Sequence, residues 1–169
     1  MKEISPFSMQ GNVFTRISKE WFLIAAGKPA DMNMMTASWG ALGELWGKEV
    51  AFCFIRPTRH TLGFVEREQF FTLNFFGEGH RDALNLCGSK SGRDLDKVQA
   101  TGLTPVACEA AGGAPYFAEA KLVLACRKLY VDDIRPECFL DPELEKKNYG
   151  LKDYHRVFVG EIVQALSAE

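Results

Sequence analysis

Two stretches of the chain bring together side chains that suit the binding of an anion. The first leads from an apolar run into a predicted helix and reads Arg56-Pro57-Thr58-Arg59-His60-Thr61. The second precedes another predicted helix and reads Ser89-Lys90-Ser91-Gly92-Arg93, with Lys97 one turn further on. Guanidinium groups, hydroxyls and the free amides of a first helical turn hold phosphates in many proteins. Taken singly, each stretch also fits a solvated loop end with a serine cap, but together they favour an anionic ligand.

A third stretch places small polar residues inside an otherwise apolar run, Asn33-Met34-Met35-Thr36-Ala37-Ser38-Trp39-Gly40. Small side chains let a flat ligand lie against backbone amides, so this stretch is a candidate ring-binding surface. The alternative is a strand end that runs into a glycine-rich turn at Gly40, Gly43 and Gly47, with Trp39 and Trp46 packed as core aromatics. The residues alone favour neither interpretation over the other.

Two glycine-containing segments resemble known nucleotide-binding or hydrolase motifs but lack residues that those motifs require. The segment Gly77-Glu78-Gly79-His80-Arg81-Asp82 has aspartate where a dinucleotide fingerprint needs its third glycine, and the chain lacks a repeated βαβ pattern. The segment Gly88-Ser89-Lys90-Ser91-Gly92 lacks the Gly-Lys-Ser/Thr ending of a P-loop and has lysine at the centre of a nucleophile elbow. Neither an ATPase nor a hydrolase is predicted.

Histidine and cysteine spacing gives no support for a metal site. The three histidines, His60, His80 and His155, are far apart in sequence, and the five cysteines are odd in number with no C-x-x-C pair. We therefore predict no metal, no disulfide framework and mostly buried, reduced thiols.

Composition and charge narrow the function classes. The chain has 169 residues, 47% of them hydrophobic and 25% charged, with a net charge of -2. Without a basic excess it is not expected to bind nucleic acid. Its longest apolar runs, residues 21–26 and 50–55, are far shorter than the roughly 18 residues of a membrane helix, so no membrane association is expected. The first seven residues contain no apolar signal region, from which we expect a cytoplasmic protein.

The hydrophobic pattern predicts one mainly β domain over residues 1–169. In residues 117–131 the even positions from Ala118 to Cys126 are apolar while the odd ones include charged residues, which predicts a half-buried antiparallel strand. Strands this long favour a closed barrel, because closure protects their edges. The full set of predicted strands is residues 13–18, 21–27, 34–39, 50–56, 70–76, 117–131 and 157–166.

Helices are expected to be short and to lie in the connections. Residues 59–68 follow Thr58 as a possible N-cap, and residues 81–87 form a second helix. A capping box at Ser91 introduces a third helix that stops at Gly102. Residues 132–152 have no clear period and are predicted to be a loop with room for one helical turn.

Four blocks in series carry a resemblance to a known family. They are Asn33-x-Met35-Thr36-Ala37-Ser38-Trp39-Gly40, Arg56-Pro57-x-Arg59-x-Thr61, Ser91-Gly92-Arg93-Asp94-x-Asp96-Lys97 and Gly102-Leu103-Thr104-Pro105. In this order and spacing they resemble the flavin reductase-like family of FMN-binding split barrels, which includes flavoredoxin. The resemblance runs from about Asn12 to Leu166 and implies a six-stranded split β-barrel with short helices in its connections, a homodimer, and FMN near the subunit interface.

The resemblance also implies a set of FMN-binding residues. The segment from Thr36 to Trp39 would line the flavin ring, the residues around Arg56 would serve the ribityl phosphate, and five further residues would complete the pocket. The expected set is Thr36, Ala37, Ser38, Trp39, Arg56, Arg59, His60, Thr61, Asn74, Cys87, Ser91, Gly92 and Lys97. Residues 109–114 and 132–148 match no part of the family pattern, so the resemblance assigns no substrate.

A bound flavin would leave little chemistry for the side chains. Hydride passes from NADH or NADPH to the flavin, and the protein binds, orients and excludes water, so no catalytic acid or base is required. Cys87 has no predicted partner that would stabilise a thiolate, and His155 is placed equally well beside the flavin or facing solvent.

Three functions remain open on this sequence. The first is an NAD(P)H-dependent flavin reductase, whose partners are flavin and nicotinamide molecules. The second is a flavoredoxin-like carrier that keeps its FMN and takes electrons from a redox partner protein. The third is a non-catalytic ligand-binding domain.

Overall fold

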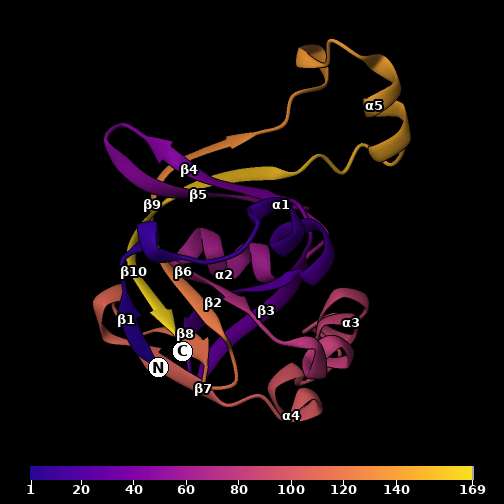
Figure 1. Cartoon of the computed structure of the whole chain (residues 1–169). Coiled ribbons are helices and arrows are strands. Elements are labelled where there is room, and N and C mark those ends of the chain that lie inside the picture. The colour runs from indigo at the N-terminus through magenta and orange to yellow at the C-terminus, as the bar shows by residue number, and fades with distance from the viewer. Residues whose placement is uncertain (169) are drawn as a thin grey trace.

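An antiparallel sheet of eight strands is the central element of the fold, in a computed structural model that describes residues 1–168. The strands follow the order β3-β2-β6-β9-β10-β5-β4, and β1 pairs with β10 (Figure 1). A separate hairpin joins β7 to β8. The bounds are β1 Lys2–Ile4, β2 Phe22–Lys28, β3 Asp31–Ala37, β4 Gly40–Leu45, β5 Lys48–Ile55, β6 Phe70–Phe75, β7 Pro105–Cys108, β8 Ala114–Phe117, β9 Leu122–Asp133 and β10 Arg156–Ser167.

The helices are short and lie between strands. Their bounds are α1 Val13–Thr15, which continues into a π-helical turn over Arg16–Glu20, α2 Thr61–Arg67, α3 Arg81–Ser89, α4 Lys97–Thr101 and α5 Pro142–Asn148. Within residues 1–168, none of these helices has the length and apolar content that a membrane crossing requires.

The sheet curls around a hydrophobic core that six of its strands share. Side chains from β2, β3, β5, β6, β9 and β10 meet in one cluster, to which β9 contributes Leu122, Leu124 and Cys126. The neighbouring Val123 and Ala125 point the other way, into two smaller clusters. The predicted strand over residues 117–131 is therefore right only from Leu122 on, because β8 ends at Phe117 and the chain turns before β9 begins. Both faces of the first half of β9 are buried rather than one, because helices and the β7–β8 hairpin cover the outer face.

A glycine lets β10 bend between its two neighbours. The pairing of β10 with β9 shifts between Val159 and Gly160, as at a β-bulge. A Cβ at Gly160 would lie 2.7 Å from the Phe71 ring and 2.8 Å from Cys126 Cβ. The absence of a side chain there allows the strand to close onto the core.

In the N-terminal half one prediction is wrong, and one of the two alternatives left open for residues 33–47 is excluded. Residues 13–18 form a helix and not a strand, because Asn12 Oδ1 accepts hydrogen bonds from the amides of Phe14 (2.9 Å) and Thr15 (3.2 Å) and starts the helix. Residues 40–45 are strand β4 and not a glycine-rich turn; the turn follows at Trp46 and Gly47, both with positive φ. Trp39 and Trp46 are exposed, so neither is a core aromatic.

The predicted helix caps also differ from those observed. The helix α2 begins at Thr61 directly after His60, and Thr58 does not cap it. The helix α4 is capped by Asp96, whose Oδ1 accepts from the Gln99 amide at 3.0 Å, whereas Ser91 only stabilises the preceding turn. The aspartate lies at the helix start, where its carboxylate also meets the positive end of the backbone dipoles.

Residues 134–155 form an arm that stands away from the barrel (Figure 1). Strand β9 enters it after Asp133, and α5 forms its far end. The predicted loop is thus partly wrong: its first two residues extend β9, and Asp141 caps a helix of seven residues by accepting from the Glu143 amide at 3.0 Å. The arm returns to the barrel at His155, whose carbonyl accepts from the Ile134 amide at 2.9 Å.

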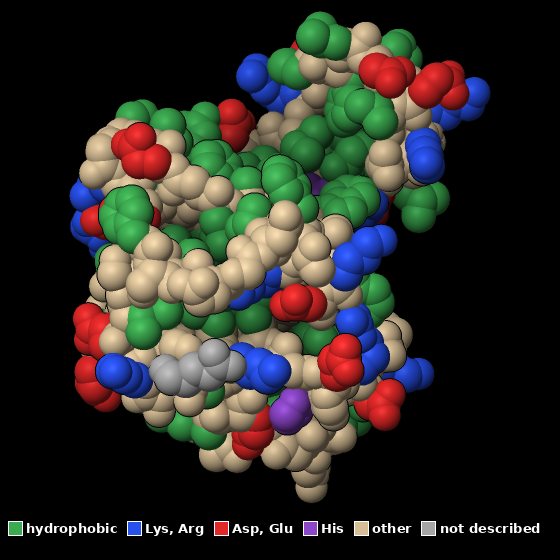
Figure 2. Space-filling view, in the orientation of Figure 1, with side chains coloured by type: hydrophobic (Ala, Val, Ile, Leu, Met, Phe, Trp, Pro, Cys, Tyr) green, Lys and Arg blue, Asp and Glu red, His purple; other side chains and the backbone are tan. Residues whose placement is uncertain are grey.

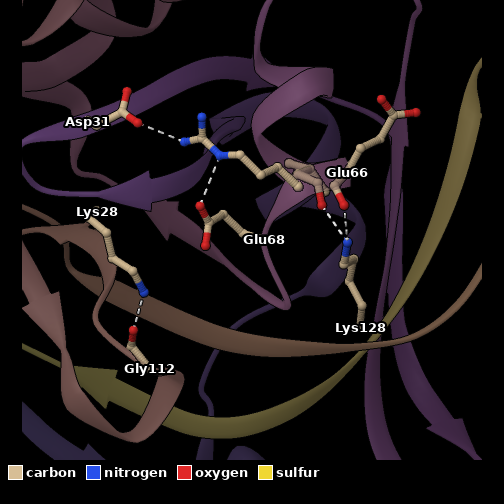
Figure 3. A network of polar contacts seen from close by, with 8 residues as sticks. Lys28, Asp31, Glu66, Glu68, Gly112 and Lys128 are labelled. Atoms are coloured by element: carbon tan, nitrogen blue, oxygen red, sulfur yellow. Dashed lines mark hydrogen bonds and ion pairs between the residues drawn. The ribbon is translucent and has the colours of Figure 1, made fainter.

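Polar contacts fix α2 against the sheet (Figure 3). The Lys128 ammonium on β9 donates to the carbonyls of Val65 (2.6 Å) and Glu66 (2.9 Å) at the C-terminal end of α2. From the same end, Arg67 pairs with Asp31 (2.9 Å) and Glu68 (3.1 Å). These contacts hold the helix, and with it the preceding residues 56–60.

Candidate functional site

Two hollows adjoin each other beside β3 and share three residues, Met35, Arg56 and Arg59. The first, which we call the β3 hollow, has a volume of about 150 Å³ and is lined by Met35, Thr36, Ala37, Ser38, Trp39, Phe54, Arg56, Arg59 and His155. The second, the basic hollow, has a volume of about 210 Å³ and is lined by Met35, Arg56, Thr58, Arg59, His60, Thr61, Ser89, Lys90, Ser91, Gly92 and Lys97. Together they form one groove with two different ends.

The β3 hollow has a floor of small side chains and a wall of rings. Its floor is the end of β3, where the Thr36 hydroxyl donates to the Leu84 carbonyl of α3 at 2.5 Å. The rings of Trp39 and His155 are 5.2 Å apart, and the Phe54 ring lies edge-on to His155 at 6.5 Å. Such a surface suits a flat ring more than a branched ligand.

His155 is buried in this wall, so it does not face solvent. Only 7% of the residue is exposed, and its Nδ1 lies 2.8 Å from the Tyr149 hydroxyl of the arm. Burial, with the Arg56 charge next in importance, lowers the pKa of His155 to about 4. The imidazole is therefore neutral at physiological pH.

The basic hollow is lined by cationic side chains and, within residues 1–168, by no carboxylate. Lys97 is 5% exposed, and its ammonium donates to the carbonyls of Met34 (2.8 Å) and Cys87 (3.0 Å). No carboxylate in residues 1–168 forms an ion pair with it. Burial lowers the pKa of Lys97, and the nearby Arg59 lowers it further. A buried cation without a carboxylate partner favours an anionic ligand.

The two arginines of the groove have different neighbours. Arg59 donates to the Gly88 carbonyl at 2.6 Å and lines both hollows. Arg56 is used mainly by the arm: it pairs with the Asp153 carboxylate at 2.8 Å, donates to the Asn148 carbonyl at 2.9 Å and lies 5.0 Å from the Tyr149 ring centre. Arg56 therefore lines the groove while it anchors the arm.

Gly92 is in close contact with β3. A Cβ at this position would lie 2.2 Å from Asn33 Oδ1, and the Asn33 amide donates to the Thr61 hydroxyl at 3.0 Å. The loop before α4 can approach β3 this closely only because residue 92 has no side chain. Gly92 and Thr61 both line the basic hollow, so the contact holds two of its lining residues in place.

Two of the predicted site residues lie elsewhere. Asn74 is fully buried and donates to the Leu23 carbonyl (3.3 Å) and the Thr72 hydroxyl (2.8 Å), while its Oδ1 accepts from the Phe117 amide at 3.2 Å. Cys87 is fully buried in α3, where burial raises its pKa to about 11, and it contributes only its carbonyl, to Lys97. Neither side chain lines the groove, and the thiol is not an activated nucleophile.

The other predicted residues do line the groove. These are Thr36, Ala37, Ser38, Trp39, Arg56, Arg59, His60, Thr61, Ser91, Gly92 and Lys97. The sequence analysis missed Phe54 and Tyr149 and left His155 undecided. Phe54 lies on the face of β5 away from the core, and a strict alternation count over residues 50–55 would have placed it there. No local signal marks Tyr149, because its role depends on how the arm folds back. Among residues 1–168, no group of three or more His, Cys, Asp or Glu side chains is placed to hold a metal ion.

Comparison with known proteins identifies the family. A sequence model described as flavin reductase like domain matches residues 14–169, which is most of the chain. The chain belongs to the flavin reductase-like family. No curated protein matches the chain by sequence.

Solved structures share the fold of this flavin reductase-like chain. Flavoredoxin from Methanosarcina acetivorans is 22% identical, with a TM-score of 0.69 over 89% of this chain and 69% of its own. An FMN-binding protein from Thermus thermophilus with bound p-hydroxybenzaldehyde is 21% identical, with a TM-score of 0.69 over 100% and 83%. A split barrel domain protein from Shewanella frigidimarina NCIMB 400 is 16% identical, with a TM-score of 0.69 over 96% and 77%. The predicted fold class, a mainly β split barrel with short helices in its connections, is confirmed.

Proposed function

We propose that this flavin reductase-like chain binds FMN along the groove, with the ring in the β3 hollow and the phosphate in the basic hollow. The two ends of the groove match the two ends of the cofactor. Thr36, Ala37 and Ser38 leave room for a flat ring beside Trp39, and the cations of the basic hollow complement a phosphate dianion.

One observation carries the proposal, namely the buried Lys97 ammonium without a carboxylate partner. Its two carbonyl acceptors leave one of its three N–H donors free, and Arg59 and His60 line the same hollow. A bound phosphate would supply the missing negative charge and would raise the lowered pKa of Lys97 toward its ordinary value.

We further propose NADH or NADPH as the electron donor. FMN, when bound, supplies the redox chemistry by accepting a hydride and passing electrons on. The side chains of the groove do the rest: they orient the ring on β3, and Trp39 and Phe54 keep water from that end. No acid or base among them is required.

Cofactor binding is tested by titration with FMN and with riboflavin, which lacks the phosphate. The wild-type protein is expected to shift the visible flavin spectrum and to bind FMN more tightly than riboflavin. The Lys97→Met variant keeps the aliphatic stem and loses the charge, so it is expected to weaken FMN about tenfold or more and riboflavin much less. Lys147→Met, on the exposed surface of α5, is the matched control and keeps wild-type affinity for both. Equal affinities for FMN and riboflavin in the wild type contradict the proposed phosphate site.

The reductase activity is tested by loss of absorbance at 340 nm when the FMN-loaded protein receives NADH or NADPH. Consumption above a flavin-only control supports the reductase. A tightly bound flavin that stays oxidised with both nicotinamides points instead to the electron carrier, which receives its electrons from a redox partner protein.

A further inference from the structure

The arm reaches the groove through one buried pair of side chains. Tyr149 lies in the arm directly after α5, and its hydroxyl is 2.8 Å from His155 Nδ1. Tyr149 is 4% exposed and His155 is 7% exposed, so the pair is shielded from water. Protein groups, and not water, therefore decide which of the two side chains donates the hydrogen bond.

Tyr149 is the donor in this pair. Its hydroxyl has no other hydrogen-bond partner within residues 1–168, so a proton on His155 Nδ1 would leave the phenolic hydrogen buried without an acceptor. Burial raises the pKa of Tyr149, which keeps the hydroxyl protonated. Burial lowers the pKa of His155 to about 4, an effect that Arg56 and Arg59 reinforce and Asp153 opposes, which keeps the ring neutral.

The remaining ring nitrogen of His155, Nε2, belongs to a side chain that lines the β3 hollow. Its Nε2 makes no hydrogen bond within the described chain, yet no fully buried side-chain nitrogen or oxygen there lacks a partner. Nε2 is therefore accessible, and His155 lines the β3 hollow between Trp39 and Arg56. With Nδ1 as the acceptor, Nε2 carries the ring hydrogen.

We propose that Tyr149 is a positioning residue that fixes His155 as the Nε2–H tautomer, so that the arm presents a neutral N–H donor to a carbonyl oxygen in the β3 hollow. Arg56 holds Tyr149 in place through its contacts with the ring, Asn148 and Asp153. The choice of ligand rests on the proposed function: the carbonyl belongs to the flavin ring or to the carboxamide of a nicotinamide.

The tautomer is tested by nitrogen NMR of protein labelled with ¹⁵N-histidine, without any ligand. The three histidines are assigned with His155→Gln, which removes one set of signals. In the wild type, His155 is expected to show a protonated Nε2 and an unprotonated, hydrogen-bonded Nδ1 near neutral pH. A protonated Nδ1 in the wild type overturns the proposal without any need for a variant of Tyr149.

Two phenylalanine substitutions separate the hydroxyl from the fold of the arm. Tyr149→Phe keeps the ring stack and is expected to shift His155 toward a mixture of tautomers. Tyr154→Phe is the matched control: its hydroxyl on the same arm binds Glu145 and not His155, so the signals of His155 stay as in the wild type. An unchanged tautomer in Tyr149→Phe, with circular dichroism showing a folded protein, overturns the positioning role.

Ligand additions then identify the carbonyl. Oxidised FMN is added first and NAD⁺ or NADP⁺ second, so that no turnover occurs. A change in the Nε2–H signal with FMN alone assigns the flavin carbonyl, a change only after the nicotinamide assigns the carboxamide, and no change with either overturns the donor role. If FMN does not bind at all, the proposed function fails, whereas the tautomer measured without ligand still decides the role of Tyr149.

Discussion

At the scale of single residues, the burial of His155 makes the fold sensitive to acid. The pKa of a histidine in the unfolded chain is about 6.5, whereas burial lowers it in the fold to about 4. Between these values the unfolded chain binds a proton that the folded chain does not. This proton uptake favours the unfolded chain: the destabilisation is absent above the unfolded pKa, grows as pH falls below it, and is complete below the folded pKa.

We therefore predict that His155→Gln flattens the acid side of the stability profile. The wild type is expected to lose up to about 3 kcal/mol through this group on acidification from neutral pH to about pH 4, and the variant is not. Urea unfolding of both proteins over this range measures the difference. Parallel profiles for the two proteins contradict the prediction.

Gly92 is the position where a single methyl group is expected to damage the site. Because a Cβ there would lie 2.2 Å from Asn33 Oδ1, Gly92→Ala should displace Asn33 from the Thr61 hydroxyl and cost about 1–3 kcal/mol of stability. The affinity for FMN should fall with it. Gly63→Ala is the control: it lies in α2 with open space around it and should stabilise the protein by roughly 0.5–1 kcal/mol. Chemical unfolding and FMN titration measure both effects.

The sequence predicted those site residues whose grouping is local. Residues 36–39 lie together because they are consecutive on one strand, and Arg59, His60 and Thr61 because they are consecutive before one helix. Asn74 and Cys87 are different, since whether a strand or helix residue faces the groove or the core depends on what packs on each side. The position of His155 could not be predicted from the sequence, because it depends on how the arm of residues 134–155 folds back onto the barrel.

At the scale of elements, Arg56 connects the arm to the barrel. We predict that Arg56→Ala frees the arm, because it removes the Asp153 ion pair, the bond to Asn148 and the contact with Tyr149 together. Hydrogen exchange should increase in residues 141–155 and stay unchanged in β6 and β9. A stability loss of about 1.5–3 kcal/mol is expected, since charged groups are involved.

An exposed ion pair on the same arm provides the control for Arg56. Lys146 and Glu143 are 3.8 Å apart with 79% of each side chain exposed, so Lys146→Ala should leave hydrogen exchange in the arm unchanged. Arg56→Ala should also weaken FMN and riboflavin by similar factors, because it acts through the wall of the β3 hollow, whereas Lys97→Met weakens FMN selectively. If Arg56→Ala weakens the binding of FMN but not of riboflavin, Arg56 binds the phosphate, and its role as the anchor of the arm is contradicted.

Elements rich in buried β-branched and aromatic residues were predicted well, and those that depend on one cap or one exposed edge were not. Strands β2, β5, β6 and β10 contain buried β-branched and aromatic residues that mark them in sequence. The helix at residues 13–18 has the β-branched content of a strand, and only the Asn12 cap reverses this preference. Strand β4 has glycines and an exposed face, so its own residues do not mark it as a strand. Its pairing with β5 holds it in strand conformation.

At the scale of the whole molecule, an apolar surface lies between the arm and the barrel (Figure 2). Next to the β3 hollow, a further hollow of about 560 Å³ is lined mainly by apolar residues, among them Phe14, Trp39, Leu42, Phe54 and Ile134. Phe14 is 79% exposed and Trp39 is 46% exposed. A contiguous apolar patch of this kind is more often a protein interface than a surface that only faces solvent.

We propose that this surface joins two copies of the chain, in agreement with the homodimer that the sequence resemblance implies. The Phe14→Asp variant tests this proposal, because it places a charge in the apolar hollow. It is expected to convert a dimer into a monomer, as measured by size-exclusion chromatography with light scattering. Phe7→Asp is the matched control, because Phe7 is equally exposed at 82% but does not line this hollow, and its variant should remain dimeric.

Since Trp39 lines both hollows, loss of the dimer should also uncover the ring end of the groove and weaken the binding of FMN and riboflavin together. A wild-type protein that is monomeric at high concentration, or a Phe14→Asp variant that is still a dimer, shows that the apolar surface has another use.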